Sequence, residues 1–70
     1  YREYALLALF LTHPKRVFER DELLEQVWGF DYSGQTRAVD IMVQRLRKKL
    51  GAQGERIKTI YGVGYKWVDA

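Results

Sequence analysis

The chain has 70 residues, of which 47% are hydrophobic and 14% aromatic, enough apolar material for one small folded domain over residues 1–70. It has no cysteine, which excludes disulfides and thiolate metal sites, and no run approaches the roughly 18 apolar residues of a membrane span. Residues 1–35 carry four basic and six acidic side chains, whereas residues 36–70 carry eight basic and three acidic. The basic second half indicates a polyanionic partner, although a solvated basic face fits the charge equally well.

The first half of the chain predicts two helices with a short strand between them. Residues 2–12 have leucine and phenylalanine at helical spacing, and Pro14 follows the end of this segment. The apolar pair at residues 17–18 predicts a brief strand. Acidic side chains then precede an apolar group, an order that predicts a second helix over residues 20–28, ended by Gly29.

The segment 36–50 predicts the longest helix. Its apolar residues recur at intervals of four, three and four and form one stripe, consisting of Val39, Val43, Leu46 and Leu50. Thr36 is expected to be the N-cap residue and Gly51 to end the helix. Between the second and third helices, the glycines, Asp and Ser of residues 29–35 indicate a loop.

The end of the chain predicts a β-hairpin. Residues 51–54 are expected to form a turn, and residues 57–60 and 65–68 to form two strands around a glycine-containing loop. Helix, short strand, helix, loop, long helix and hairpin follow one another, an order that places the chain in the α+β class.

The face of the long helix opposite its apolar stripe is basic and contains one aliphatic residue. At 100° per residue this face holds Arg37, Ile41, Gln44, Arg45 and Lys48, with Ala38 and Lys49 at one edge and Asp40 and Arg47 at the other. Ile41 is misplaced for a core residue but suits a surface that a partner covers. On a DNA duplex, arginine fits guanine, a carboxylate accepts from cytosine and an aliphatic group packs on a thymine methyl. A basic face with one stray isoleucine also occurs on ordinary protein surfaces.

Neither the hairpin nor the remaining polar residues indicate catalysis. Lys58, Tyr61 and Lys66 lie in or beside a turn that could enter a groove of DNA, but an ordinary hairpin with a charged rim has the same residues. The single histidine, His13, has no second histidine with which to share a metal. The carboxylates before the second helix are typical of a helix start rather than of an acid–base pair. We therefore expect no enzyme activity, no metal and no cofactor.

Two consecutive motifs resemble the effector domain of OmpR/PhoB-type response regulators. Residues 37–50 read RAVDIMVQRLRKKL, against the family pattern R-T-V-D-x-h-I-x-R-L-R-x-K-L. Residues 57–65 read IKTIYGVGY, against I-x-T-V-R-G-x-G-Y, and residues 3–7, 13–14 and 23–29 also match the family's first two helices. The resemblance implies a winged helix-turn-helix fold with three helices, a short strand and a C-terminal β-hairpin wing.

The resemblance also implies what the domain does. It would bind double-stranded DNA sequence-specifically as the output domain of a two-component transcriptional regulator in the bacterial cytoplasm. The helix at about 36–50 would enter the major groove, and the wing at about 57–68 would lie on the adjacent backbone or minor groove. Family members follow a receiver domain and a small N-terminal sheet, which we expect this chain to lack, and they bind direct repeats as tandem homodimers.

Individual roles follow from the matched positions. Asp40 and Arg45 would be the principal base readers, with Ile41 against a thymine methyl and with Arg37 and Arg47 on phosphates or base edges. The other positions at which the resemblance and the basic face imply DNA contacts are Trp28, Gln44, Lys48, Thr59, Tyr61 and Tyr65. The loop that would face RNA polymerase contains Phe30, Asp31, Tyr32 and Ser33.

The sequence departs from the family pattern at Ala38, Met42, Gln44 and Tyr61, the last of which replaces a wing arginine. Fewer cations predict a shallower salt dependence of DNA binding than a more basic relative would show. Two other interpretations stay open on the residues alone. One is a protein-interaction winged helix whose basic face meets an acidic partner, and the other is a nucleic-acid binder without sequence specificity.

Overall fold

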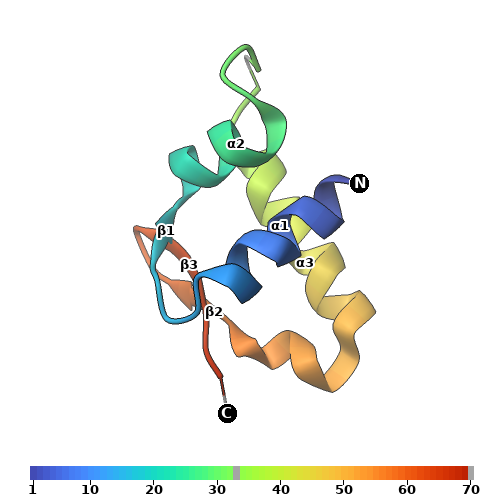
Figure 1. Ribbon diagram of the computed structural model, residues 1–70. Coiled ribbons are helices and arrows are strands. Elements are labelled where there is room, and N and C mark those ends of the chain that lie inside the picture. The colour runs from blue at the N-terminus through green and yellow to red at the C-terminus, as the bar shows by residue number, and fades with distance from the viewer. Residues whose placement is uncertain (33, 70) are drawn as a thin grey trace.

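The computed structural model describes residues 1–32 and 34–69, and within them helices pack against one small antiparallel sheet (Figure 1). In chain order the elements are α1 (Arg2–Thr12), β1 (Phe18–Glu19), α2 (Arg20–Trp28), α3 (Arg37–Leu50), the 3-10 helix η1 (Gly51–Arg56), β2 (Ile57–Ile60) and β3 (Gly64–Trp67). The predicted order and class are confirmed, and the three helices span the predicted residues to within one position.

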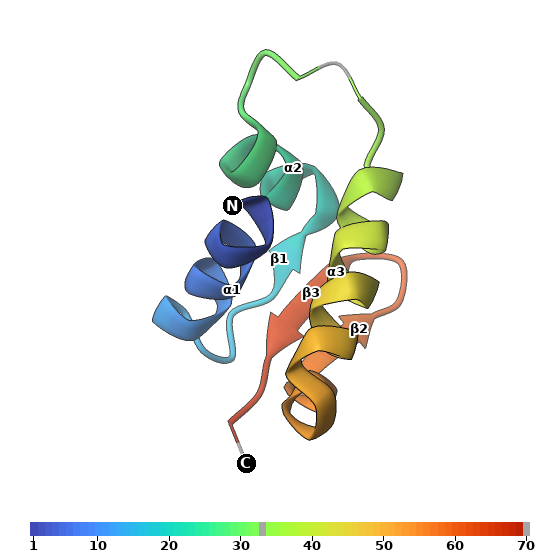
Figure 2. The same cartoon turned by 90° about the vertical axis from the view of Figure 1, so that its right-hand side faces the viewer.

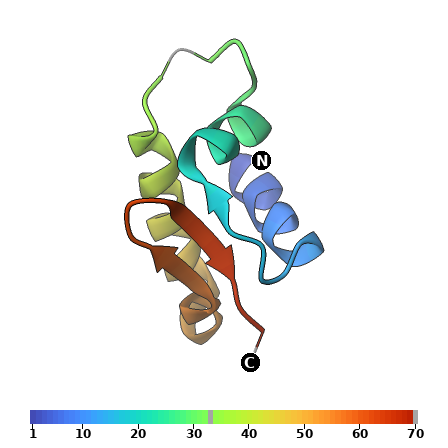
Figure 3. The same cartoon turned by 90° about the vertical axis from the view of Figure 1, so that its left-hand side faces the viewer.

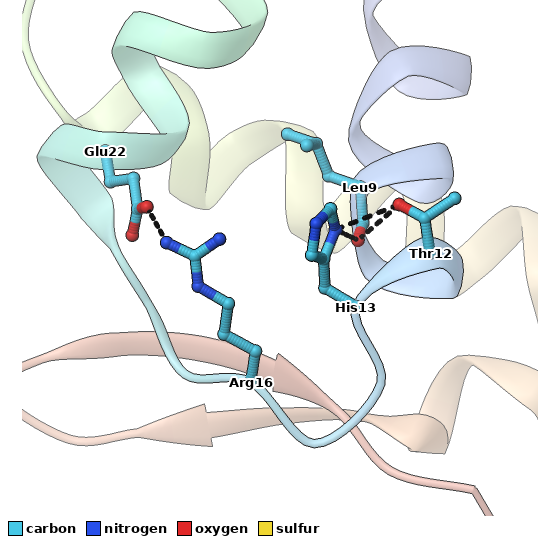
Figure 4. A network of polar contacts seen from close by, with 5 residues as sticks. All are labelled: Leu9, Thr12, His13, Arg16 and Glu22. Atoms are coloured by element: carbon cyan, nitrogen blue, oxygen red, sulfur yellow. Dashed lines mark hydrogen bonds and ion pairs between the residues drawn. The ribbon is translucent and has the colours of Figure 1, made fainter.

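The connection from α1 to β1 is held by polar contacts at the end of the helix (Figure 4). The Thr12 hydroxyl donates to the Ala8 carbonyl at 2.7 Å, and His13 Nδ1 lies 3.1 Å from the Leu9 carbonyl oxygen. Arg16 forms an ion pair with Glu22 of α2. These contacts hold the side chains of residues 12 and 13 against the end of α1 and join the connection to α2.

The sheet has the strand order β1-β3-β2, and both neighbours of β3 are antiparallel to it. A turn joins β2 to β3, closed by a hydrogen bond of 2.9 Å from the Val63 amide to the Ile60 carbonyl, with Gly62 at φ 78°. The Arg20 amide donates to the Val63 carbonyl at 3.3 Å, which attaches this turn to the start of α2. β3 is therefore paired with β1 on one side and with β2 on the other, and the hairpin turn is attached to α2.

One core connects the three helices with the sheet. Its fully or nearly buried members are Leu6, Phe10, Phe18, Leu23, Val39, Val43, Leu46, Ile57, Tyr65 and Trp67. The rings of Phe10 and Phe18 pack edge to face, with centroids 6.0 Å apart. Each large apolar side chain buried in this way contributes about 1.5–3 kcal/mol. Because α3 supplies three of these residues from one stripe, its opposite face must point outward.

Three local predictions need correction. The predicted turn at residues 51–54 is the start of η1, and Gly54 is buried so closely against α3 that an added Cβ would lie 2.3 Å from the Arg47 carbonyl oxygen. Thr36 is the N-cap residue of α3, but its side chain makes no capping hydrogen bond. Strands β1 and β3 are each displaced by one residue from their predicted positions, because pairing of Phe18 with Tyr65 determines their register.

Within the part of the chain that the structure describes, no helix is long and apolar enough to cross a membrane.

Candidate nucleic-acid interface

Most of the predicted site residues on α3 lie on its outward face. Its exposed members are Arg37, Ile41, Gln44, Arg45 and Lys48. This face combines three cations with no carboxylate, and Ile41 at its centre is 44% exposed. Figure 2 shows α3 along one flank of the molecule, beside the hairpin. A helix that is exposed along such a face can enter the major groove of B-DNA, which is about 12 Å wide.

The two edges of α3 are fastened to its neighbours. On one edge, Lys49 Nζ forms an ion pair at 2.7 Å with Glu3 Oε1 of α1, and the nearby ammonium group lowers the pKa of Glu3. On the other edge, Asp40 and Arg47 lie seven residues apart and both contact the hairpin. The helix is therefore restrained on both sides of its exposed face.

The Asp40 carboxylate is at the centre of a polar hub that joins α2, α3 and β3. Arg20 Nε donates to Asp40 Oδ1 at 3.1 Å, a second Arg20 nitrogen donates to Oδ2, and the Tyr65 hydroxyl donates to Oδ1 at 2.7 Å. Burial alone raises the pKa of Asp40, but the hydrogen bonds from Arg20 and Tyr65 outweigh it, and the pKa is lowered. Burial and the hydrogen bond to Asp40 raise the pKa of Tyr65 to about 12. The carboxylate is thus held in its charged form by groups of the same chain.

Arg47 makes a second connection, from α3 to the free edge of β2. Its Nε and Nη2 donate to the Ile57 carbonyl at 3.1 and 2.6 Å, and Nη2 donates to Thr59 Oγ1 at 2.9 Å. The guanidinium carbon lies 5.7 Å from the centre of the Tyr65 ring. Arg47 therefore satisfies an edge carbonyl that would otherwise have no partner in the sheet.

A groove of about 630 Å³ separates α3 and η1 from β2. It is lined by Arg47, Gly51, Gly54, Glu55, Ile57, Lys58, Thr59 and Tyr61. Tyr61 lies in the hairpin turn at the end of this groove and is 91% exposed. The groove thus runs from the C-terminal end of α3 toward the tip of the wing.

The remaining predicted residues surround the end of α2. Trp28 is half-buried, with the Arg2 guanidinium 5.6 Å from its ring centre and the Tyr32 ring 6.1 Å away. Phe30 is 85% exposed, and Asp31 is exposed as well. Ser33, predicted for the same loop, lies outside the described residues.

The predicted site residues on α3 and the hairpin thus fall into two groups. One group is exposed on α3 and at the wing tip. The other has internal partners and consists of Asp40, Arg47, Thr59 and the 8% exposed Tyr65. The sequence interpretation missed Arg20, because no local pattern connects it with an acidic residue twenty positions later. The sequence did place Asp40 and Arg47 on one edge of the helical wheel, which was a weak signal that both contact the same neighbouring element.

Comparisons with known proteins agree with this geometry. A family model described as "Transcriptional regulatory protein, C terminal" matches residues 1–67. The heme response regulator HssR of Staphylococcus saprophyticus is 46% identical over 70 residues, which are 97% of this chain and 31% of that protein. The chain spans about three tenths of the length of the curated relatives that it matches.

Solved structures give the same result. The DNA-binding domain of Bacillus subtilis CssR superimposes with a TM-score of 0.88 at 43% identity, covering 96% of this chain and 74% of that one. The Klebsiella pneumoniae RstA DNA-binding domain, solved in complex with the RstA box, gives 0.79 at 37% identity, covering 96% and 69%. Together with the winged-helix architecture, these matches show that the chain belongs to the OmpR/PhoB-type family of transcriptional regulatory C-terminal domains, which are not enzymes.

Proposed function

We propose that this domain binds double-stranded DNA sequence-specifically, with α3 in the major groove, as the output domain of a two-component transcriptional regulator. The observation that carries the proposal is the outward face of α3, where Ile41 lies among three cations without a carboxylate. Two relatives with the same fold, RstA and AdeR, have been solved in complex with DNA.

The exposed side chains of this face have two proposed roles, contact with base edges and contact with phosphates. Arg45 and Gln44, exposed in the middle of α3, can donate to base edges, and Ile41 offers an apolar surface to a thymine methyl. Arg37 and Lys48, toward the two ends of the face, are placed to neutralise phosphates and set the register of the helix.

Asp40, Arg47 and Tyr65 serve in this proposal to position α3 rather than to read bases. A carboxylate that accepts from cytosine needs a free oxygen aimed at the groove, whereas both oxygens of Asp40 already accept hydrogen bonds. Turning Asp40 toward DNA would leave the Tyr65 hydroxyl without its partner. We therefore assign the principal base-reading role to Arg45 and not to Asp40.

The wider context belongs to the same proposal. In a longer protein the domain would follow a receiver domain, act in the bacterial cytoplasm and bind direct repeats as a tandem homodimer. The exposed Phe30 and its neighbours Asp31 and Tyr32 would face RNA polymerase, since a projecting aromatic residue suits a protein contact.

Selection of bound duplexes from a random pool, at stated salt, tests this function. We expect one enriched motif, repeated at a fixed spacing in the same orientation. The variant Ile41→Ala should lose preference at one position of the motif, whereas Gln26→Ala, an exposed change on α2, should retain the full motif. Recovery of no motif by the wild type would reject sequence-specific binding and favour an unspecific binder or a protein-interaction domain.

A further inference from the structure

Arg20, the first residue of α2, holds the single carboxylate of α3. Residues 37–50 contain five cations and one acidic residue, Asp40. Asp40 Oδ1 accepts from Arg20 Nε and from the Tyr65 hydroxyl, whereas Oδ2 accepts from a second Arg20 nitrogen. Within residues 1–32 and 34–69, Oδ2 has no other hydrogen-bond donor. Loss of Arg20 would therefore free one carboxylate oxygen while Tyr65 keeps the other.

This pair lies at the surface, beside the outward face of α3. Asp40 follows Arg37 by three positions and precedes Gln44 by four, so it borders two exposed residues of that face. The Arg20 and Asp40 side chains are 42% and 26% exposed. A hollow of about 200 Å³ beside them is lined by both residues and by the hairpin turn, residues 59–65. Figure 3 shows this turn next to α3. A freed Oδ2 would thus not be enclosed in the core.

A free carboxylate at this edge would change which base the helix prefers. Burial raises the pKa of Asp40, but the hydrogen bond from Tyr65, which does not depend on Arg20, lowers it. The freed group therefore stays charged near pH 7 and can only accept hydrogen bonds. In the major groove, a carboxylate accepts from the N4 amine of cytosine, which no cation or aliphatic group of α3 can do.

We propose that Arg20 is a positioning residue that determines base specificity, because it holds Asp40 Oδ2 and so keeps an acceptor for cytosine out of the DNA interface. Arg20 itself contacts no base and acts through Asp40. The base preference is thereby left to Ile41, Gln44 and Arg45. This inference rests on the proposed DNA-binding function and adds to it a determinant of base preference that lies outside α3.

Base-preference profiles of Arg20→Met and of the double variant R20M/D40A test the proposal. Methionine keeps an unbranched side chain but has no donor, and alanine removes the carboxylate. Arg20→Met should gain a preference for cytosine at one base pair, roughly five- to tenfold, the lower end of the range for one base contact. R20M/D40A should lack this gain. The control Arg16→Met removes the arginine of the ion pair with Glu22 and should keep the wild-type profile.

Thermal unfolding of each free protein sets an assay temperature below its midpoint. If Arg20→Met does not fold, Arg20→Gln, which keeps a neutral amide near Asp40, takes its place and should gain the same preference to a smaller degree.

Three results would overturn the proposal. Two are a wild-type profile for the folded Arg20 variant and retention of the cytosine preference in R20M/D40A. The third is equal weakening of every duplex in both variants, with the slope of log K against log salt reduced by about 0.9, since Arg20 would then neutralise a phosphate itself. Failure of the wild type to prefer any duplex would instead reject the proposed function of α3, which distinguishes the two failures.

Discussion

Replacing Tyr65 by phenylalanine tests the polar hub behind α3 with the smallest change of shape. The variant keeps the buried ring and removes the hydroxyl that donates to Asp40 at 2.7 Å. A hydrogen bond to a charged acceptor contributes about 1.5–3 kcal/mol. For a domain of 70 residues, whose expected free energy of unfolding is roughly 4–10 kcal/mol, that loss is a large fraction of the total.

The ionisation of Tyr65 in the wild type gives a second magnitude. The pKa of Tyr65 is raised from 10.0 to about 12, so the fold favours the neutral phenol. Its contribution to stability is therefore fully present below pH 10 and is lost as the pH rises toward 12. At about 1.36 kcal/mol for each unit of pKa, the loss across this window is on the order of 3 kcal/mol, to which burial of the phenol contributes most and its hydrogen bond to Asp40 contributes next.

Urea unfolding followed by tryptophan fluorescence, at pH 7 and through the alkaline range, measures both effects. We expect Tyr65→Phe to be less stable than the wild type by about 1.5–3 kcal/mol at pH 7, with the difference shrinking between pH 10 and 12. The control Tyr61→Phe removes a hydroxyl from a 91% exposed side chain and should change neither quantity. Equal stability of Tyr65→Phe and wild type at pH 7, or a constant difference up to pH 12, would refute the reasoning.

Three further changes test other parts of the structure. Arg47→Met leaves the Ile57 carbonyl without its donor and should lower the free energy of unfolding by about 1–3 kcal/mol in the same urea assay; no loss would show that water replaces the guanidinium. Gly64→Ala places a Cβ 1.9 Å from the Phe18 carbonyl oxygen, so amide exchange in β1 and β3 should accelerate. Gly62→Asn is strained only by its φ of 78°, since no atom lies within 4 Å of the added Cβ, and should accelerate exchange less. The slope of log K against log salt should correspond to fewer than eight neutralised phosphates, since Arg47 is engaged within the domain; a slope equivalent to eight or more would contradict this.

The sequence alone predicted the features of the fold that depend on local periodicity. The apolar stripe of residues 36–50 predicted both the bounds of α3 and its exposed face, because a helix repeats every 3.6 residues and its core contacts repeat with it. Gly29 and Gly51 end their helices at the predicted positions. The family motifs added the winged-helix topology, which no single segment of the chain could indicate.

Contacts between distant segments could not be predicted in this way. Arg20 and Tyr65 reach Asp40 across twenty and twenty-five residues, and no spacing rule connects them. For the same reason the strand bounds were displaced by one residue, since the pairing of β1 with β3 determines them. The segment after Gly51 became a 3-10 helix rather than a turn because Gly54 packs against the backbone of α3.

The most direct test of the account is a base-preference profile for Arg45→Ala, Asp40→Asn and the wild type. Each protein is titrated, at one salt concentration, against the preferred duplex and all its single base-pair substitutions. We predict that Arg45→Ala loses about 1–3 kcal/mol of discrimination at one base pair, while folded Asp40→Asn keeps the wild-type profile. A profile in which Arg45→Ala weakens every duplex equally, or in which Asp40→Asn alone loses one preference, would contradict the account.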